Sequence, residues 1–270
     1  MARSHYDFTR DADLLEAYSG SAPRVAPKIL NIHPARSVID VGCNIGVWLR
    51  AFLDHGVERV LGIDGDYVDM AKLLVDPALF LRRDLNQPVG DIGLFDLAIS
   101  LEVGEHLKPG RAKGFVGDLC QLADVVLYGA AVPFQGGELH VNEQWQSYWA
   151  QLFADNGYVA YDVLRRAIWA QPNVAYWYKQ NAIFYVKAGS AAHERFRTRY
   201  GEPSDTMFDV VHPELFRGKV WRLKNGNFVD RLINRFRTSG GEARGEVLSR
   251  HLHGDDHWRA PRRDDLATHR

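Results

Sequence analysis

The stretch VIDVGCNIG, residues 38–46, decides how the rest of the chain is interpreted. An apolar run that contains Asp40 leads into a turn that contains Gly42, Asn44 and Gly46, and a helical pattern follows. A strand, a glycine-bearing turn and a helix in this order bring backbone N–H groups close to a ligand. The stretch therefore predicts a ligand-binding turn at the end of a buried strand.

The spacing of the turn argues against a dinucleotide as that ligand. Dinucleotide-binding turns follow the pattern G-x-G-x-x-G. Counted from Gly42, the next two glycine positions hold Asn44 and Val47, so the match fails. A carboxylate at Asp40 would repel a pyrophosphate, whereas it would attract an ammonium group directly or through water. We therefore expect a ligand that carries a cation near this turn.

Short apolar runs alternate with helical patterns beyond the turn, which is typical of a parallel sheet with crossover helices. Two later runs with only a loop between them predict an antiparallel edge hairpin. The expected strands lie within residues 37–42, 59–64, 79–84, 94–100, 124–132, 159–164 and 181–187. The expected helices lie within residues 47–56, 66–75, 112–123 and 142–157, with Gly56 and Gly157 as stop signals.

The length of 270 residues suits one large α/β domain with appended segments. The predicted division is a helical lead-in at 1–27, a ligand-binding domain at 28–189, a C-terminal extension at 190–237 and a flexible tail at 238–270. The tail is rich in Gly, Arg, Asp and His and has little periodic apolar signal.

The composition indicates a soluble protein. Hydrophobic residues make up 46% and charged residues 25% of the chain, and no apolar stretch is long enough to span a bilayer. The N-terminal residues carry charges where a signal peptide needs an apolar segment, and the only cysteines are Cys43 and Cys120. These features predict a cytoplasmic, reduced protein. A net charge of −1 gives no overall electrostatic reason to bind nucleic acid.

The opening stretch resembles the first motif of class I S-adenosylmethionine (SAM) methyltransferases, in which an acid precedes G-x-G-x-G and Asn44 takes the place of the middle glycine. Asp64, Asp84 and the run FDLAISLEVGEHL at 95–107 follow in the order of the family's later motifs. The resemblance covers about residues 25–187. It implies a Rossmann-like α/β fold with a seven-stranded, mostly parallel sheet, an antiparallel edge hairpin and helices on both faces.

The resemblance also implies SAM as the cofactor and assigns its contacts. Asp64 would bind both ribose hydroxyls, Asp84 would meet the adenine amino group, and Leu85 would lie beside the base. The full set of expected cofactor contacts is Asp40, Gly42, Cys43, Asn44, Gly46, Asp64, Asp84, Leu85, Leu101 and Glu102.

A methyltransferase that acts on an alcohol needs a general base or a Lewis-acidic metal, because an alcohol is a poor nucleophile until its proton leaves. Acids and histidines stand where open α/β sheets place ligands, at the end of the fourth strand and in the loop after the fifth. We expect a catalytic role for Glu105, His106 and His140. A Glu-x-x-Glu-His run with a distal histidine suits Mg²⁺, Mn²⁺, Fe²⁺ or Zn²⁺, and the four candidate ligands are Glu102, Glu105, His106 and His140.

The same run resembles the metal-binding pattern of small-RNA terminal 2′-O-methyltransferases and of ubiquinone-pathway O-methyltransferases. It also occurs in relatives without a metal. Two further interpretations therefore stay open at this point. His140 could act as a base or orient the substrate without a metal, or it could be purely structural.

Two aromatic clusters also need an explanation. Trp145, Trp149 and Phe153 recur at helical spacing, which favours burial against the sheet. A second cluster, Trp169 with residues 176–178, interrupts the predicted hairpin as a substrate-covering insertion could. An aromatic subunit interface in a homo-oligomer is the alternative for this cluster.

Residues 140–153, 168–181 and 208–216 resemble segments of bacterial methyltransferases associated with polysaccharide or glycan biosynthesis. This implies O-methylation of a hydroxyl of a sugar, a glycan or a glycosylated small metabolite. The alternatives are an RNA ribose or a peptide group as the acceptor, and a catalytically silent partner protein with the same fold.

Overall fold

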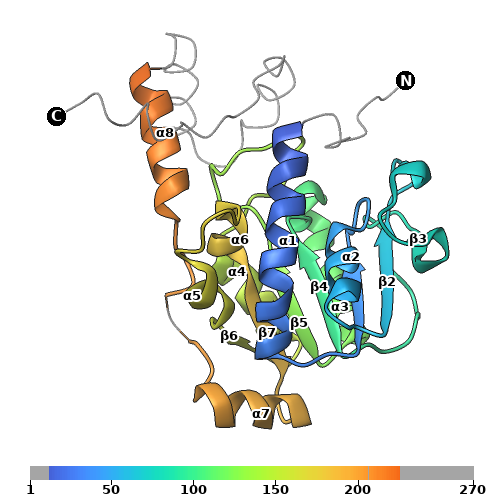
Figure 1. The fold of residues 1–270 in the computed structure, drawn as a ribbon. Coiled ribbons are helices and arrows are strands. Elements are labelled where there is room, and N and C mark those ends of the chain that lie inside the picture. The colour runs from blue at the N-terminus through green and yellow to red at the C-terminus, as the bar shows by residue number, and fades with distance from the viewer. Residues whose placement is uncertain (1–11, 206, 226–270) are drawn as a thin grey trace. The chain divides into compact units, whose positions relative to one another are not determined.

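The computed structural model describes residues 12–205 and 207–225 (Figure 1). The chain divides into two compact units, Met1–Val210 and Val211–Arg270. The flexible tail predicted at 238–270 lies outside the described residues. In the second unit the structure describes helix α8 (Pro213–Asn225). No helix in the described parts of the chain is long and apolar enough to cross a membrane.

The first unit is built on a seven-stranded sheet with the order β3-β2-β1-β4-β5-β7-β6. Its first five strands are parallel, and β7 runs antiparallel to both β5 and β6. The strands are β1 (Ser37–Val41), β2 (Arg59–Asp64), β3 (Phe80–Arg82), β4 (Leu97–Leu101), β5 (Val125–Gly129), β6 (Tyr158–Tyr161) and β7 (Ile183–Lys187). The predicted seven-stranded, mostly parallel sheet with an antiparallel edge is confirmed.

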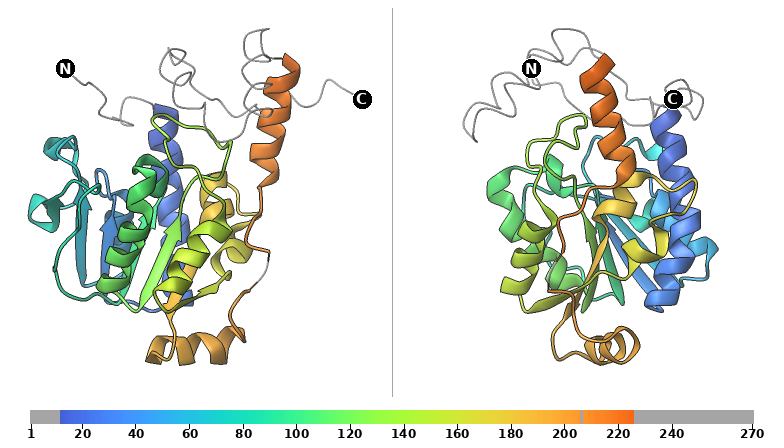
Figure 2. Two further views of the ribbon diagram at one scale, coloured as in Figure 1. Left: turned by 180° about the vertical axis from the view of Figure 1, so that it is seen from behind. Right: turned by 90° about the vertical axis from the view of Figure 1, so that its left-hand side faces the viewer.

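Helices cover both faces of this sheet (Figure 2). One face carries α1 (Ala12–Ile32) and α2 (Val47–Asp54), and the other carries α3 (Ala112–Leu122) and α4 (Gln146–Asp155). The strand order reverses between β1 and β4, and open α/β sheets bind ligands at such a switch point, beyond the carboxyl ends of the strands. The predicted stop signals hold, because Gly56 (φ 87°) and Gly157 (φ 79°) follow α2 and α4 in the left-handed region.

The helix predicted at 66–75 is wrong. The structure has turns there and two short 3₁₀ helices, η2 (Met70–Lys72) and η3 (Pro77–Leu79). Each is capped by its own acid: the Asp69 side chain accepts from Ala71 N at 3.0 Å, and the Asp76 side chain accepts from Ala78 N at 2.8 Å. Such local caps compete with a continuous helix.

The loop predicted between the last two strands is also wrong, because two helices connect them, α5 (Leu164–Ile168) and α6 (Tyr176–Asn181). The aromatic side chains of α6 are buried, so they pack in the core and do not form an exposed cover over a substrate. Tyr178 shows this packing: the Trp48 indole N–H donates to its hydroxyl at 3.4 Å, and the two rings meet edge to face. The predicted burial of Trp149 and Phe153 is confirmed, but the predicted burial of Trp145 is wrong, because this side chain is 40% exposed.

Candidate active site

The turn after β1 has the backbone geometry that its residues allow. Gly42 (φ 91°), Asn44 (φ 47°) and Gly46 (φ 81°) all adopt left-handed conformations. Asparagine tolerates this region better than other residues with a Cβ, which explains how Asn44 stands where a glycine is expected. A Cβ at Gly42 would overlap the Val103 side chain, so the turn packs closely against the segment after β4.

Asp64, the last residue of β2, hydrogen-bonds to the backbone of this turn and so links the turn to β2. It is buried, and its Oδ2 accepts from Asn44 N at 2.7 Å while its Oδ1 accepts from Gly65 N at 2.7 Å. The Tyr67 hydroxyl also donates to Oδ1. Burial raises the pKa of Asp64, and these donors act in the opposite direction. The structure therefore places the predicted ribose-binding acid directly beside the predicted methionine-binding turn.

Asp40 lies on β1 next to β2 and is also buried. Within the described residues its Oδ2 has no hydrogen-bond partner. Burial, followed by the nearby Asp64 charge, raises the pKa of Asp40 well above its usual range. A cationic group bound at this turn would offset both effects. Cys43, in the same turn, is a buried free thiol whose pKa burial raises well above its usual range, which argues against a nucleophilic role.

The remaining predicted cofactor contacts lie at the same edge of the sheet. Asp84 and Leu85 follow β3, whose Arg82 pairs with Asp64 of β2. Asp84 is exposed and its Oδ1 accepts from Asn86 N at 2.9 Å, whereas Leu85 is buried. Leu101 ends β4 and is buried.

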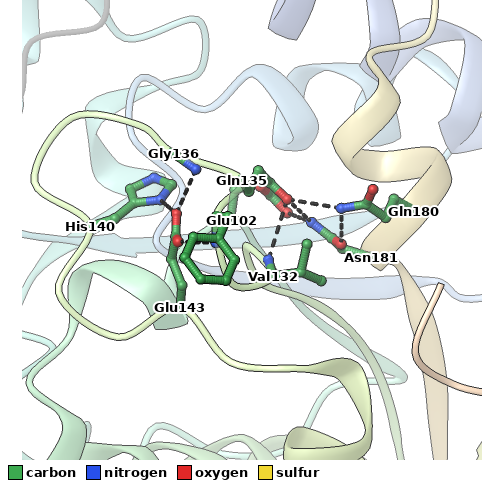
Figure 3. Close-up of polar contacts among 9 residues, drawn as sticks. Glu102, Val132, Gln135, Gly136, His140, Glu143, Gln180 and Asn181 are labelled. Carbon is green, nitrogen blue, oxygen red and sulfur yellow. Dashed lines mark hydrogen bonds and ion pairs between the residues drawn. The ribbon is translucent and has the colours of Figure 1, made fainter. Parts of the chain in front are cut away.

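Glu102 follows β4 in a left-handed conformation (φ 58°) and belongs to a network of side-chain amides (Figure 3). Its carboxylate accepts from Gln135 Nε2 at 2.7 Å and from Asn181 Nδ2 at 2.8 Å. Gln135 Oε1 in turn accepts from Asn181 Nδ2 and Gln180 Nε2, both at 3.0 Å. Burial raises the pKa of Glu102, and the Asn181 and Gln135 donors counteract that effect.

The other three candidate metal ligands do come together. One possible ligand atom each from Glu105, His106 and His140 lies within 4.8 Å of the other two. The two imidazole rings are edge to face, with centroids 4.8 Å apart. Burial, and then the neighbouring His140, lowers the pKa of His106 to about 3, so that its imidazole is neutral at pH 7. A neutral imidazole has the lone pair that a metal or a proton requires.

Glu105 is the most unusual member of this cluster. It is fully buried, and in the part of the chain that the structure describes neither carboxylate oxygen has a hydrogen-bond partner. Burial, and then the Glu102 charge, raises the pKa of Glu105 well above its usual range, while the backbone N–H groups of Glu105 and Ala131 act in the opposite direction. A buried carboxylate without partners is costly unless a cation or a proton compensates it. The donor set therefore fits a divalent cation.

The loop between β5 and α4, residues 132–143 (the site loop), presents His140 to this cluster. His140 Nδ1 lies 2.9 Å from Glu143 Oε1, and Glu143 also accepts from Gly136 N at 2.7 Å and Phe134 N at 2.8 Å (Figure 3). One carboxylate thus orients the imidazole and closes the loop. A Cβ at Gly137 would overlap Nε2 of His140, so the ring needs a glycine beside it.

Comparisons with known proteins bear on the fold. No family model and no curated protein matches the chain. Among solved structures, the chain is similar to Streptomyces venezuelae DesVI, with 14% identity over 68% of this chain and 100% of that chain and a TM-score of 0.52. It is also similar to a structure of the Haloferax volcanii Trm112 methyltransferase activator in complex with a methyltransferase. That match has 14% identity, covers 66% of this chain and 93% of that chain, and has a TM-score of 0.50. The chain has a methyltransferase fold.

A third similar structure is magnesium protoporphyrin IX methyltransferase from Synechocystis PCC 6803 with bound SAH, S-adenosylhomocysteine. The two chains are 17% identical, and the match covers 69% of this chain and 90% of that chain with a TM-score of 0.48. The likeness to all three proteins concerns the fold.

The interpretation of the sequence missed the residues that support the site. The sequence pattern assigns no role to Glu143 or to the amide groups that bind Glu102. The amides lie 33 and 79 residues from Glu102 along the chain, so no local pattern joins them to it. The three-residue spacing of His140 and Glu143 was the one local signal available.

Proposed function

We propose that this protein is a SAM-dependent methyltransferase. The observation that carries the proposal is the pair of buried acids, Asp40 and Asp64, at the ends of neighbouring strands on either side of a left-handed glycine turn. The unpartnered oxygen of Asp40 would attract the ammonium group of SAM, directly or through water. Asp64 would accept from the ribose hydroxyls, with Asp84 and Leu85 along the adenine.

The proposed reaction is O-methylation. A hydroxyl oxygen attacks the methyl carbon of SAM, the bond from sulfur to the methyl group breaks, and S-adenosylhomocysteine leaves. In the absence of a metal, His140 would accept the hydroxyl proton at Nε2, because an imidazole that donates its Nδ1–H to Glu143 has its lone pair on Nε2. A metal bound at Nε2 would occupy that lone pair, and the metal would then take over the activation of the hydroxyl. Positioning supplies much of the acceleration, since the methyl donor is already activated by its positive sulfur.

We propose that a divalent metal binds to Glu105, His106 and His140. The unpartnered Glu105 oxygens and the neutral His106 support this assignment. One carboxylate with two imidazoles suits Zn²⁺, Fe²⁺ or Mn²⁺ better than Mg²⁺, which prefers oxygen ligands. A bound metal would lower the pKa of a hydroxyl that contacts it. Glu102, the fourth ligand expected from the sequence, is instead hydrogen-bonded to amides in this structure.

The proposed acceptor is a hydroxyl of a sugar, a glycan or a glycosylated small metabolite. It rests on the resemblance of residues 140–153, 168–181 and 208–216 to glycan-associated methyltransferases. An RNA ribose, a peptide group and a catalytically silent role are the competing assignments.

Two measurements test the proposed function. Calorimetry of the full chain with SAM and S-adenosylhomocysteine should show binding, and a protein that binds neither would contradict the methyltransferase assignment. Incubation with tritiated SAM and fractionated cell extract should place the label in a small-molecule or glycan fraction. Label found only in RNA or protein would contradict the glycan assignment and leave the methyltransferase assignment intact.

A further inference from the structure

The site loop is held rigidly from within, although its middle is exposed. Glu143 joins its two sides, as described above. The carbonyl of Glu105 accepts from Val141 N at 2.8 Å and from Asn142 N at 3.0 Å, which fastens the loop to the segment after β4. Gln135 ties the first part of the loop to Glu102. The backbone of the loop is therefore ordered before any acceptor arrives.

This ordered backbone presents apolar side chains to solvent. Phe134 is 56% exposed, Leu139 is 39% exposed and Val141 is 58% exposed. Leu139 and Val141 flank His140 in the sequence, and Glu143 binds the backbone of Phe134 and the ring of His140 with the same carboxylate. Exposed apolar groups gathered beside a catalytic group indicate a binding surface.

Two of these side chains are held outward in a disfavoured conformation. Phe134 (φ 67°) and Leu139 (φ 58°) both lie in the left-handed region. Bulky residues rarely adopt it, and where they do the strain is concentrated at ligand-binding sites. Neither side chain is buried, so packing in the core does not explain the conformation.

The charges of the segments around the site disfavour a polyanionic acceptor. No lysine or arginine occurs in residues 37–49, 60–71, 84–107 or 114–164, which supply most of the candidate site. The same segments contribute Glu102, Glu105, Glu138 and Glu143. Helix α6, which supplies Asn181, contains Lys179, and that side chain is buried. Proteins that bind nucleic acid or phosphorylated ligands neutralise phosphate with lysine and arginine, and this site would repel it.

We infer that the site loop recognises an uncharged acceptor whose apolar portion packs on Phe134, Leu139 and Val141 while its hydroxyl reaches His140. The inference rests on the proposed function and selects one class within it, the glycosides that carry an apolar aglycone. A polar, phosphorylated or polyanionic glycan does not match the exposed side chains or the charges of this site.

Matched acceptor pairs test this inference. Each of several neutral hexoses is supplied as its methyl glycoside and as its 4-nitrophenyl glycoside, and binding to the protein saturated with S-adenosylhomocysteine is titrated by saturation-transfer NMR. In at least one pair the aryl glycoside should bind about tenfold more tightly, because burying an aromatic ring gives enough free energy for such a ratio. A sugar phosphate and a short RNA serve as anionic probes.

A double variant, Phe134→Asn with Leu139→Asn, removes the apolar groups and keeps residues that tolerate the left-handed region. It should abolish the preference for the aryl glycoside and leave S-adenosylhomocysteine binding unchanged. Leu94→Asn is the matched control, since Leu94 is exposed and precedes β4 at the opposite edge of the sheet.

Equal binding within every pair, no binding of any pair, or tighter binding of the sugar phosphate or the RNA would overturn the inference. Calorimetry with S-adenosylhomocysteine on the same sample separates these results from failure of the proposed function, which would show as loss of cofactor binding.

Discussion

The Nδ1 atom of His140 lies 2.9 Å from Oε1 of Glu143, and this contact links the orientation of the imidazole to the conformation of the whole site loop. The same carboxylate accepts from the backbone of Phe134 and Gly136, so the loop cannot open without releasing the ring. A carboxylate behind a histidine fixes its tautomer and ring orientation, whether the other nitrogen holds a metal or takes a proton.

We predict that Glu143→Gln lowers kcat about 10- to 100-fold, the range that loss of such supporting carboxylates produces. A glutamine amide has one accepting oxygen, so its NH₂ group would face a backbone N–H that needs an acceptor. Steady-state kinetics would measure the loss, and calorimetry should show unchanged SAM affinity. Glu138→Gln, an exposed glutamate of the same loop, is the control. Full activity of Glu143→Gln would remove Glu143 from the mechanism.

Gly137→Ala should reduce turnover without weakening SAM binding. An added Cβ would overlap Nε2 of His140, so the imidazole has to turn away from Glu105 and His106. Gly137 has no left-handed φ, so alanine fits its backbone and the variant should fold normally. Gly110→Ala is the control, because a Cβ there meets no atom within 4 Å. An unchanged rate for Gly137→Ala would show that the ring position is not critical.

Much of the sheet could be predicted from the sequence, because apolar runs and glycine stops are local signals. β1 and α2 illustrate this, since the strand, the turn and the helix occur where VIDVGCNIG and Gly56 place them. The structure of residues 66–75 could not be predicted, because their apolar spacing suits a helix, whereas Asp69 caps a short turn within the segment and Asp76 caps another directly after it.

The candidate site was predictable for residues that end a strand and not for residues that support them. The positions of Asp40 on β1, of Asp64 on β2 and of Glu105 in the segment after β4 could be predicted, since parallel strands bring their carboxyl ends to one edge. Asn181 was not predictable, because its role depends on α6 lying beside the end of β4. The burial of Tyr178 was missed for the same reason, as its partner Trp48 is 130 residues away.

Asp64→Asn should weaken SAM binding about 10- to 100-fold, because hydrogen bonds to a charged group are worth roughly 1.5–3 kcal/mol. The asparagine side chain has the same size but only one accepting oxygen. The N–H groups of Asn44 and Gly65 and the ribose hydroxyls would then have fewer acceptor atoms to bind. Calorimetry measures the affinity, and circular dichroism checks that the fold persists. Asp66→Asn, an exposed neighbour, should bind SAM normally. Tight binding by Asp64→Asn would exclude the ribose assignment.

His33, which is buried and bonded through Nε2 to the Asp96 carbonyl at 3.0 Å, should make the fold sensitive to acid. Burial lowers the pKa of His33 below its unfolded value of 6.5, although the bond to Asp96 opposes this. The unfolded chain therefore takes up a proton first as the pH falls, and stability declines below about pH 6.5. His33→Gln should show a shallower loss of unfolding free energy between about pH 7 and pH 5 in urea titrations. His55→Gln, at an exposed position, should follow the parent protein, and identical slopes for all three would contradict the prediction.

The variant Glu105→Gln tests whether Glu105 is a metal ligand or a structural acid. The buried Glu105 carboxylate has two oxygens without partners, so replacing it should leave the metal-free protein as stable as before or more stable. The parent protein should gain stability from the metal itself: at a free Zn²⁺ or Mn²⁺ concentration of about one hundred times Kd, the unfolding free energy should rise by about 2.7 kcal/mol. Binding should also release a proton, because burial raises the pKa of Glu105 well above its usual range.

Thermal unfolding with and without each ion, after treatment with EDTA, measures this gain. Glu105→Gln and His106→Ala should lose it, and Glu102→Gln should keep it, because Gln135 and Asn181 bind the Glu102 carboxylate in place of a metal. Chelation should abolish turnover of the parent protein, and the ion that stabilises it should restore turnover. Full activity in excess EDTA together with an unchanged melting temperature would exclude the metal and leave His140, oriented by Glu143, as the only base of the site loop.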